Sequence, residues 1–128
     1  MADGMSPQLL RGWHAHEASG IIWSKKQAML ALKNPKSQKQ VRIKGLLPPS
    51  PNIGTSSITV TVNRRIAGEI RNESADFSTF DTRITLQDPA EYLYVALDAA
   101  RLYRPSLHGS STDSRDLGFA LQSVEVCG

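Results

Sequence analysis

Apolar and polar residues alternate along much of the chain, and this period of two indicates extended strands. The stretch 57–63 shows it most clearly, because Ile58, Val60 and Val62 fall on one face while threonines fall on the other. No window longer than ten residues keeps apolar residues at spacings of three and four, as an amphipathic helix requires. We therefore predict a protein built mainly from β-strands.

Further stretches with strand character follow the same rule and end at residues that favour turns. The other predicted strands are 28–33, 40–44, 66–71, 77–86, 92–98 and 117–126. Residues 95–103 fit a short helix as well as an extended strand. The apolar positions of the last strand shift by one residue near Gln122 and Ser123, which predicts an irregularity there.

Turn and loop signals separate these strands. Asn63 opens a tight turn before 66–71, because asparagine tolerates left-handed backbone angles, and Gly68 marks a candidate bulge. The prolines fall outside the strand interiors. The two long loops, about 47–56 and 104–116, are places where a binding function could lie.

Short strands at this spacing predict an all-β fold, an antiparallel β-sandwich of the jelly-roll kind with seven or eight short strands. The length of 128 residues suits one domain. We expect residues 1–11 to form a flexible polar lead-in and residues 12–127 to form the single domain.

Charge and cysteine content narrow the classes of function. The net charge is only +3, and the one basic-rich stretch, 25–44, has no aromatic residue after Trp23. A nucleic-acid surface would need denser basic residues with interleaved aromatics, so we expect a solvated strand face and no nucleic-acid partner. One cysteine, Cys127, excludes an internal disulfide and favours a reducing cytosol, which predicts a cytoplasmic protein.

The chain carries no sequence signal for a membrane. No apolar run approaches the roughly 20 residues that a spanning helix needs. The first ten residues lack the basic and apolar regions of a signal peptide. We therefore expect no membrane insertion.

The densest group of unusual side chains lies near the start of the chain. It contains both tryptophans, two histidines and a carboxylate: Trp13, His14, His16, Glu17 and Trp23. An exposed indole can stack on the apolar face of a sugar ring, and neighbouring polar groups can hydrogen-bond its hydroxyls. The alternative is that both indoles anchor the core at one end of the sandwich.

Arg115 belongs to the same candidate ligand-binding set. Its planar guanidinium could grip a glycan, or it could form a structural ion pair with Glu17 if the first and last strands are neighbours. His14 and His16 lack the further ligands that zinc requires, and Asp113 with Asp116 would give calcium only two. We therefore expect no metal and no cofactor.

Catalytic motifs are weak. The chain has no Gly-x-Ser-x-Gly elbow and no glycine-rich phosphate loop. Glu17, Asp113 and Asp116 could flank a glycosidic bond, but no spacing rule selects them. We expect no catalytic residue and no enzymatic activity.

The motifs at the two ends of the chain carry a resemblance. Gly12-Trp13-x-x-x-Glu17, then Trp23-Ser24, then Asp113-x-Arg115-x-Leu117-Gly118-Phe119 resemble the β-sandwich modules of bacterial glycosyltransferases and related cell-surface polysaccharide proteins. The resemblance spans about residues 12–126. Gly20-Ile21-Ile22 departs from the charged run that often precedes the tryptophan in that family. The resemblance implies a jelly-roll fold and a non-catalytic role beside a transferase.

Three functions follow as hypotheses. The first is a non-catalytic carbohydrate-binding accessory module of a larger bacterial glycan-handling protein, with a polysaccharide or glycan as ligand and a parent glycosyltransferase domain as partner. The second is a structural or protein-interaction domain that packs against that transferase without a ligand of its own. The third, a small hydrolase or lyase, would need polar residues converging in one cleft.

Overall fold

The computed structural model describes residues 8–14, 21–48, 56–72, 76–87, 90–100 and 117–127. These residues form eight β-strands and no helix. The strands are β1 (Gln8–Trp13), β2 (Ile22–Lys33), β3 (Gln40–Leu47), β4 (Ser56–Val62), β5 (Arg65–Asn72), β6 (Ser78–Thr85), β7 (Tyr92–Ala99) and β8 (Ala120–Cys127). The all-β prediction is confirmed.

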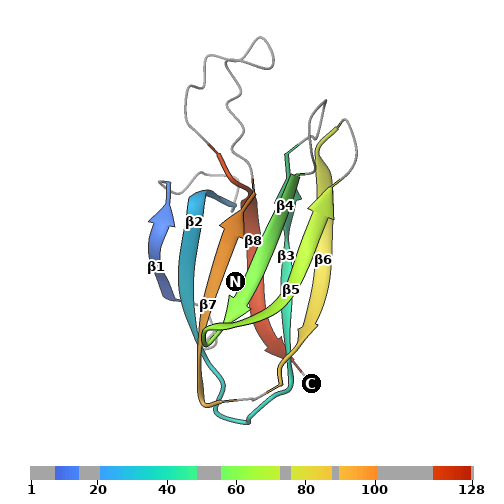
Figure 1. The fold of residues 1–128 in the computed structure, drawn as a ribbon. Helices are drawn as coiled ribbons and strands as arrows, with labels where there is room; N and C mark the ends of the chain where they lie inside the picture. Colours follow the sequence, from blue (N-terminus) through green and yellow to red (C-terminus); the bar gives the residue numbers. More distant parts are fainter. Residues whose placement is uncertain are drawn as a thin grey trace.

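The strands form two layers, and all of their pairings are antiparallel (Figure 1). One layer has the order β1-β2-β7-β4-β5, and the other contains β8, β3 and β6. β2 belongs to both, because its residues 27–33 pair with β7 while Ile22 and Trp23 pair with β8. This is the antiparallel sandwich that the alternating pattern predicts.

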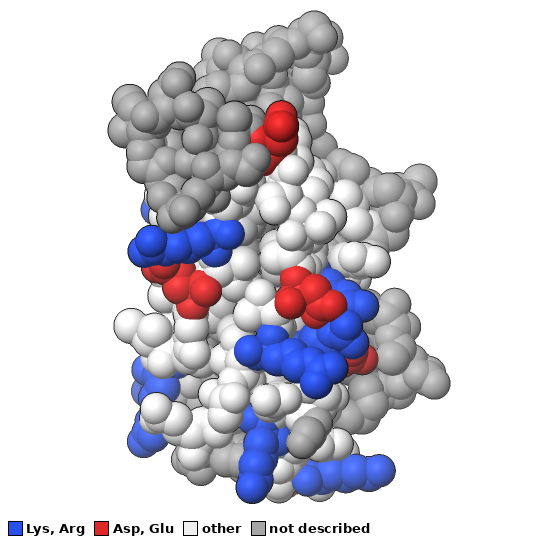
Figure 2. All heavy atoms as spheres, turned by 90° about the vertical axis from the view of Figure 1, so that its right-hand side faces the viewer, with Lys and Arg blue, Asp and Glu red and all other residues white. Residues whose placement is uncertain are grey.

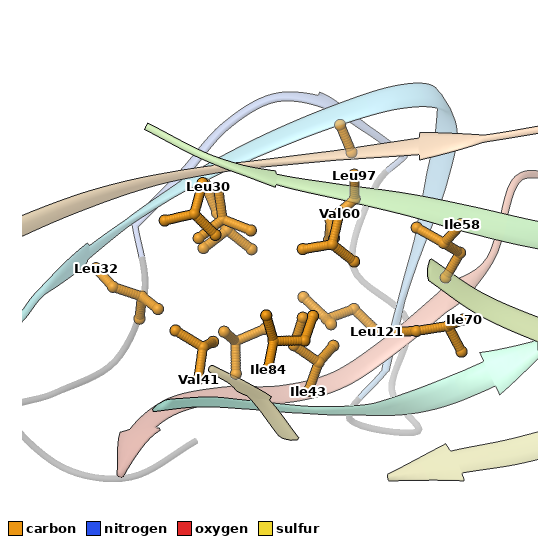
Figure 3. Packing of buried hydrophobic residues seen from close by; sticks show 14 of the residues in the cluster. Leu30, Leu32, Val41, Ile43, Ile58, Val60, Ile70, Ile84, Leu97 and Leu121 are labelled. Atoms are coloured by element: carbon orange, nitrogen blue, oxygen red, sulfur yellow. The ribbon is translucent and has the colours of Figure 1, made fainter. Parts of the chain in front are cut away.

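The core lies between the two layers and consists of the apolar positions that the period of two selects. Leu30, Val60 and Leu97 come from the first layer, and they face Ile43 and Leu121 from the second (Figure 3). Each of these side chains has at most 1% of its surface exposed. Removing apolar surface from water contributes roughly 25 cal/mol per Å², so this contact is the main source of the fold's stability.

The hairpin between β4 and β5 follows the predicted turn. Asn63 and Arg64 have φ angles of 48° and 71°, and Val62 pairs with Arg65 on either side of them. Two consecutive positive φ angles in a two-residue loop are the mark of a type I′ turn. The bulge lies beside Gly68, at Ala67, because Val60 pairs with Gly68 and Thr61 pairs with Ile66.

Other details refine the predicted strands. β7 runs through Ala99 as a strand, so the helical interpretation is wrong for the described part of 95–103. β2 begins six residues earlier than predicted. The prediction missed this part because the polar run Lys25-Lys26-Gln27 interrupts the apolar alternation. β8 has its irregularity at Gln122, as predicted, because Lys44 pairs with Ser123 and Gly45 with Leu121.

The first strand begins before the expected start of the domain. β1 starts at Gln8, four residues before residue 12, and pairs with β2 from its first residue. Leu9 packs against the core from this strand. Residues 8–11, expected in the flexible lead-in, are therefore part of the sheet, because pairing with β2 satisfies their backbone. The division into domains stays a prediction.

Candidate functional site

Trp23, one of the two predicted sugar-stacking residues, lies in the structure as a core side chain. Only 9% of its surface is exposed, and it packs with Leu117 and Ala120 in a small apolar cluster. Its ring also meets the Phe77 ring edge to face, with centroids 6.4 Å apart. A ring so enclosed leaves no face on which a sugar could stack.

Trp13 is half-buried and held in place from two sides. Its indole N–H donates a hydrogen bond to the Met29 carbonyl at 2.9 Å, and its ring meets Phe119 edge to face at 5.9 Å. Gly12, at φ 85°, lets the two strands come together, because a Cβ there would overlap the Gln27 carbonyl. Trp13 thus anchors β1 to the sandwich.

The motifs from the two ends of the chain meet at this point. The Ser24 hydroxyl accepts a hydrogen bond from the Phe119 backbone N–H at 3.0 Å, and the Ser24 N–H donates to the Phe119 carbonyl at 2.8 Å. The Gly118 N–H donates to the Ser24 carbonyl at 2.9 Å. A Cβ at Gly118 would collide with the Ser24 hydroxyl. The described motif residues therefore join the first and last segments of the fold.

The remaining predicted site residues divide into one that is described and three that are not. His14 is half-buried, and its backbone N–H donates to the Trp23 carbonyl at 2.9 Å. His16, Glu17 and Arg115 lie outside the described residues, so the proposed Glu17–Arg115 contact stays a prediction. Within the described part of the chain, His, Cys, Asp and Glu form no group of three that could hold a metal ion.

A different region offers an open surface with the features of a ligand site. It is a hollow of about 550 Å³ on the outer face of the first layer. Strands β2, β4 and β7 and the β4–β5 turn supply its lining. The lining residues are Met29, Thr61, Asn63, Arg64, Tyr92, Tyr94 and Ala96. We name this hollow the tyrosine groove.

Two tyrosines give the groove its aromatic surface. Tyr92 and Tyr94 are 52% and 53% exposed, whereas Leu93 and Val95 between and beyond them are buried. Alternate residues of a strand share a face, so the two rings stand on the same side of β7, roughly 7 Å apart along the strand. Two small side chains on the same face, Ala96 on β7 and its β4 partner Thr61, leave the rings accessible.

Asn63 fixes the backbone beneath these rings. Its side-chain oxygen accepts a hydrogen bond from the Tyr94 N–H at 2.8 Å, and its side-chain nitrogen donates to the Tyr92 carbonyl at 3.2 Å. Its own N–H donates to the Tyr94 carbonyl at 3.0 Å. The amide thus continues the β4–β7 ladder past the end of β4, and it holds both tyrosines on an ordered strand.

On the outer face of the second layer, by contrast, Arg42 on the middle strand β3 is paired with acidic side chains. Arg42 donates two hydrogen bonds to Asp81, at 2.8 and 2.7 Å, and lies 3.8 Å from Glu125. The hydrogen bond from Arg42 is the main reason that the pKa of Asp81 lies below its ordinary value. Figure 2 shows that, on the side carrying β5 and β6, acidic and basic side chains form small mixed groups at mid-height.

The sequence already contained the signal for the tyrosine groove. Placing Leu93, Val95 and Leu97 on the buried face of a strand assigns Tyr92 and Tyr94 to the opposite face. The tryptophans were predicted as sugar-stacking residues because indoles offer the largest aromatic surfaces. Alternation alone did not show that β7 has strands on both sides, which makes its outer face a broad surface.

Comparisons with known proteins bear on the fold. No protein-family model matches the chain, and no curated protein sequence matches it. A solved family 35 carbohydrate-binding module from an environmental isolate superposes with a TM-score of 0.52 and 15% identity, over 98% of this chain and 85% of that one. The chain has the same β-sandwich fold.

A second solved structure agrees. It is a family 115 4-O-methyl-α-glucuronidase with specificity for decorated arabinogalactans, which matches with a TM-score of 0.50 and 15% identity. The match covers 84% of this chain but only 14% of that enzyme. The shared sandwich therefore corresponds to a small part of the glucuronidase.

The described residues of the present chain include no helix with the length and apolar character to cross a membrane.

Proposed function

We propose that the protein is a non-catalytic carbohydrate-binding module whose site is the tyrosine groove. The observation that carries the proposal is the pair of half-exposed rings, Tyr92 and Tyr94, on one face of β7 beside an open hollow. A tyrosine ring presents an apolar face on which the C–H face of a sugar ring can stack, and its hydroxyl can hydrogen-bond a sugar hydroxyl. A rigid strand also holds the rings without the ordering cost of a loop.

The fold comparison supports this proposal. A solved structure with the same sandwich over nearly the whole chain is a carbohydrate-binding module. We further propose that the protein works as an accessory part of a larger glycan-handling protein, as the resemblance to bacterial glycosyltransferase modules implies. The cytoplasmic location and the transferase partner stay predictions.

Glycan titration followed by NMR tests the proposal. Neutral and acidic oligosaccharides are added to the labelled protein, and amide shifts are expected along β7 and at Asn63. Tyr94→Ala should weaken binding at least about tenfold, which corresponds to about 1.4 kcal/mol. Ile66→Ala is the matched control, because Ile66 is 77% exposed but does not line the groove.

The result that would contradict the proposal is equally specific. If no oligosaccharide shifts the β7 amides at millimolar concentration, or if Tyr94→Ala binds as the unaltered protein does, the groove is not the site. Far-ultraviolet circular dichroism confirms that each variant keeps its fold.

A second function has one observation in its favour. Ile66 is almost fully exposed on β5, which lies at the edge of the first layer, and exposed apolar residues on edge strands favour contact with another protein. This supports the interaction domain that packs against a transferase. In that case Ile66→Ala, and not Tyr94→Ala, should weaken association with the neighbouring domain of the parent protein.

A further inference from the structure

Arg64 occupies a backbone position that disfavours its side chain. Its φ of 71° lies in the left-handed region, where a Cβ crowds the following carbonyl. The second central position of a type I′ turn favours glycine, and Asn-Gly is its preferred pair. Such a residue persists where the surroundings or a function require it. The backbone strain at Arg64 therefore indicates that its side chain has a role.

The guanidinium is free to meet a ligand. Arg64 is exposed and lines the tyrosine groove. Among the described residues it forms no ion pair, whereas Arg42 pairs with Asp81 and Arg71 with Glu69. An arginine guanidinium presents a planar fork of donors that fits the two oxygens of a carboxylate or the oxygens of a sulfate.

A second cation lies at the same end of the groove. Lys33 is the register partner of Tyr92 across the β2–β7 pair, so the two side chains share a face with their Cβ atoms roughly 5 Å apart. Lys33 is also exposed and has no ion pair within the described residues. It extends the positive charge from Arg64 across the Tyr92 end of the groove.

The acidic residue on the outer face of β7 lies farther along that strand. Asp98 is the nearest acid on the outer face of β7, six residues from Tyr92, or roughly 20 Å along the strand, and it accepts a hydrogen bond from Gln27 at 3.4 Å. Glu91 is exposed and directly precedes Tyr92.

We propose that the tyrosine groove selects glycans that carry an oxyanion, a carboxylate or a sulfate, held by Arg64 and Lys33 beside a sugar ring stacked on Tyr92 or Tyr94. This inference rests on the proposed function and adds the class of ligand. The tyrosines supply affinity for the ring, and the two cations at one end fix the position of the anionic substituent.

Matched ligands isolate the contribution of the charge. Binding of oligogalacturonate is compared with that of the same oligosaccharide after methyl esterification, and a sulfated galactan is tested against its desulfated form. We expect the charged member of at least one pair to bind about tenfold more tightly at low salt. This advantage should shrink as salt is raised, because exposed charges are screened. If the galacturonate pair shows the difference, the oxyanion is a carboxylate; if the galactan pair shows it, the oxyanion is a sulfate.

Arg64→Gly gives the sharpest test because its two effects have opposite signs. Glycine suits the turn, so the variant should raise Tm by about 4 °C. It should also remove most of the advantage of the charged ligand, with Lys33 retaining the remainder, while binding of the neutral ligand stays unchanged. Arg65→Gln is the control, since Arg65 is exposed nearby but does not line the groove.

The outcomes separate this inference from the proposed function. If charged and neutral ligands bind equally and Arg64→Gly changes neither, the oxyanion inference is overturned while the carbohydrate site stands. If no glycan of either kind shifts β7, both are overturned. If Arg65→Gln loses charge selectivity as fully as Arg64→Gly does, the effect comes from net charge alone, and the assignment to Arg64 is wrong.

Discussion

The aromatic residues at the Trp13–Trp23 end of the sandwich and those in the tyrosine groove have opposite roles. Trp23 is 9% exposed and packs against the segment that leads into β8, whereas Tyr92 and Tyr94 are more than half exposed on an outer face. The difference shows that aromatic type alone does not identify a binding surface. The face of the strand on which a ring falls, and what covers that face, decide its role.

The largest expected effect is on stability at the tryptophan end. Trp23→Ala removes a nearly buried ring, so we expect a loss of about 3–5 kcal/mol in the free energy of unfolding. Tyr92→Ala, at an exposed position, should change it by less than about 0.5 kcal/mol. Chemical denaturation followed by circular dichroism measures both. Similar losses for the two variants would remove the distinction between the regions.

A smaller effect is expected where the two ends of the chain are joined. Ser24→Ala deletes the hydroxyl that accepts from the buried Phe119 N–H, and an unsatisfied buried donor costs about 1–3 kcal/mol. The control is Ser123→Ala, at a half-buried position on β8, where we expect a change of less than about 0.5 kcal/mol. A Ser24→Ala protein as stable as the control would show that water replaces the hydroxyl and that the join is weaker than its geometry suggests.

The smallest effect concerns Arg42, whose pairing with Asp81 contrasts with Arg64, which forms no ion pair among the residues that the structure describes. The pKa of Asp81 is lowered in the folded protein, chiefly by its hydrogen bond with Arg42. The pair therefore stabilises the fold above the unfolded-state pKa of Asp81, and this contribution disappears as the pH falls through the lower, folded-state value. Because both groups are exposed, solvent screening keeps the effect small.

Thermal melting between neutral pH and about pH 2 measures this contribution when Asp81→Asn is compared with the unaltered protein. The variant should melt slightly lower at neutral pH and approach the unaltered protein in acid, because the carboxylate is then protonated in both states. A constant difference across the whole range would show that Asp81 acts through packing rather than through its charge.

The sequence was sufficient for the fold because burial follows the period of two in nearly every strand. Val60 of β4 is buried as the pattern requires, and so are the alternating residues Leu93, Val95 and Leu97 of β7. β1 escaped prediction because it has a bulged register, with shifts between Leu9 and Arg11 and between Arg11 and Trp13, so its apolar residues do not alternate. The first six residues of β2 were not predicted as a strand because three consecutive polar residues interrupt the alternation.

The candidate site could be predicted only in part. The motif residues do meet in space, since Trp13 contacts Phe119 and Trp23 packs with Leu117. Their proximity was predictable from the two ends of the chain, but their burial was not, because it depends on which strands cover them. The groove required knowledge that Asn63 and Arg64, distant in sequence from Tyr92, lie beside it through the β4–β7 pairing.

A single long strand that serves both layers has a mechanical consequence. Twelve residues of β2 continue from pairing with β8 to pairing with β7, so neither layer can slide over the other without breaking hydrogen bonds between this strand and its neighbours. The Trp23 end and Lys33, the partner of Tyr92, therefore belong to one continuous strand. A ligand that rigidifies the groove would slow amide exchange at the far end of the molecule through the peptide backbone itself.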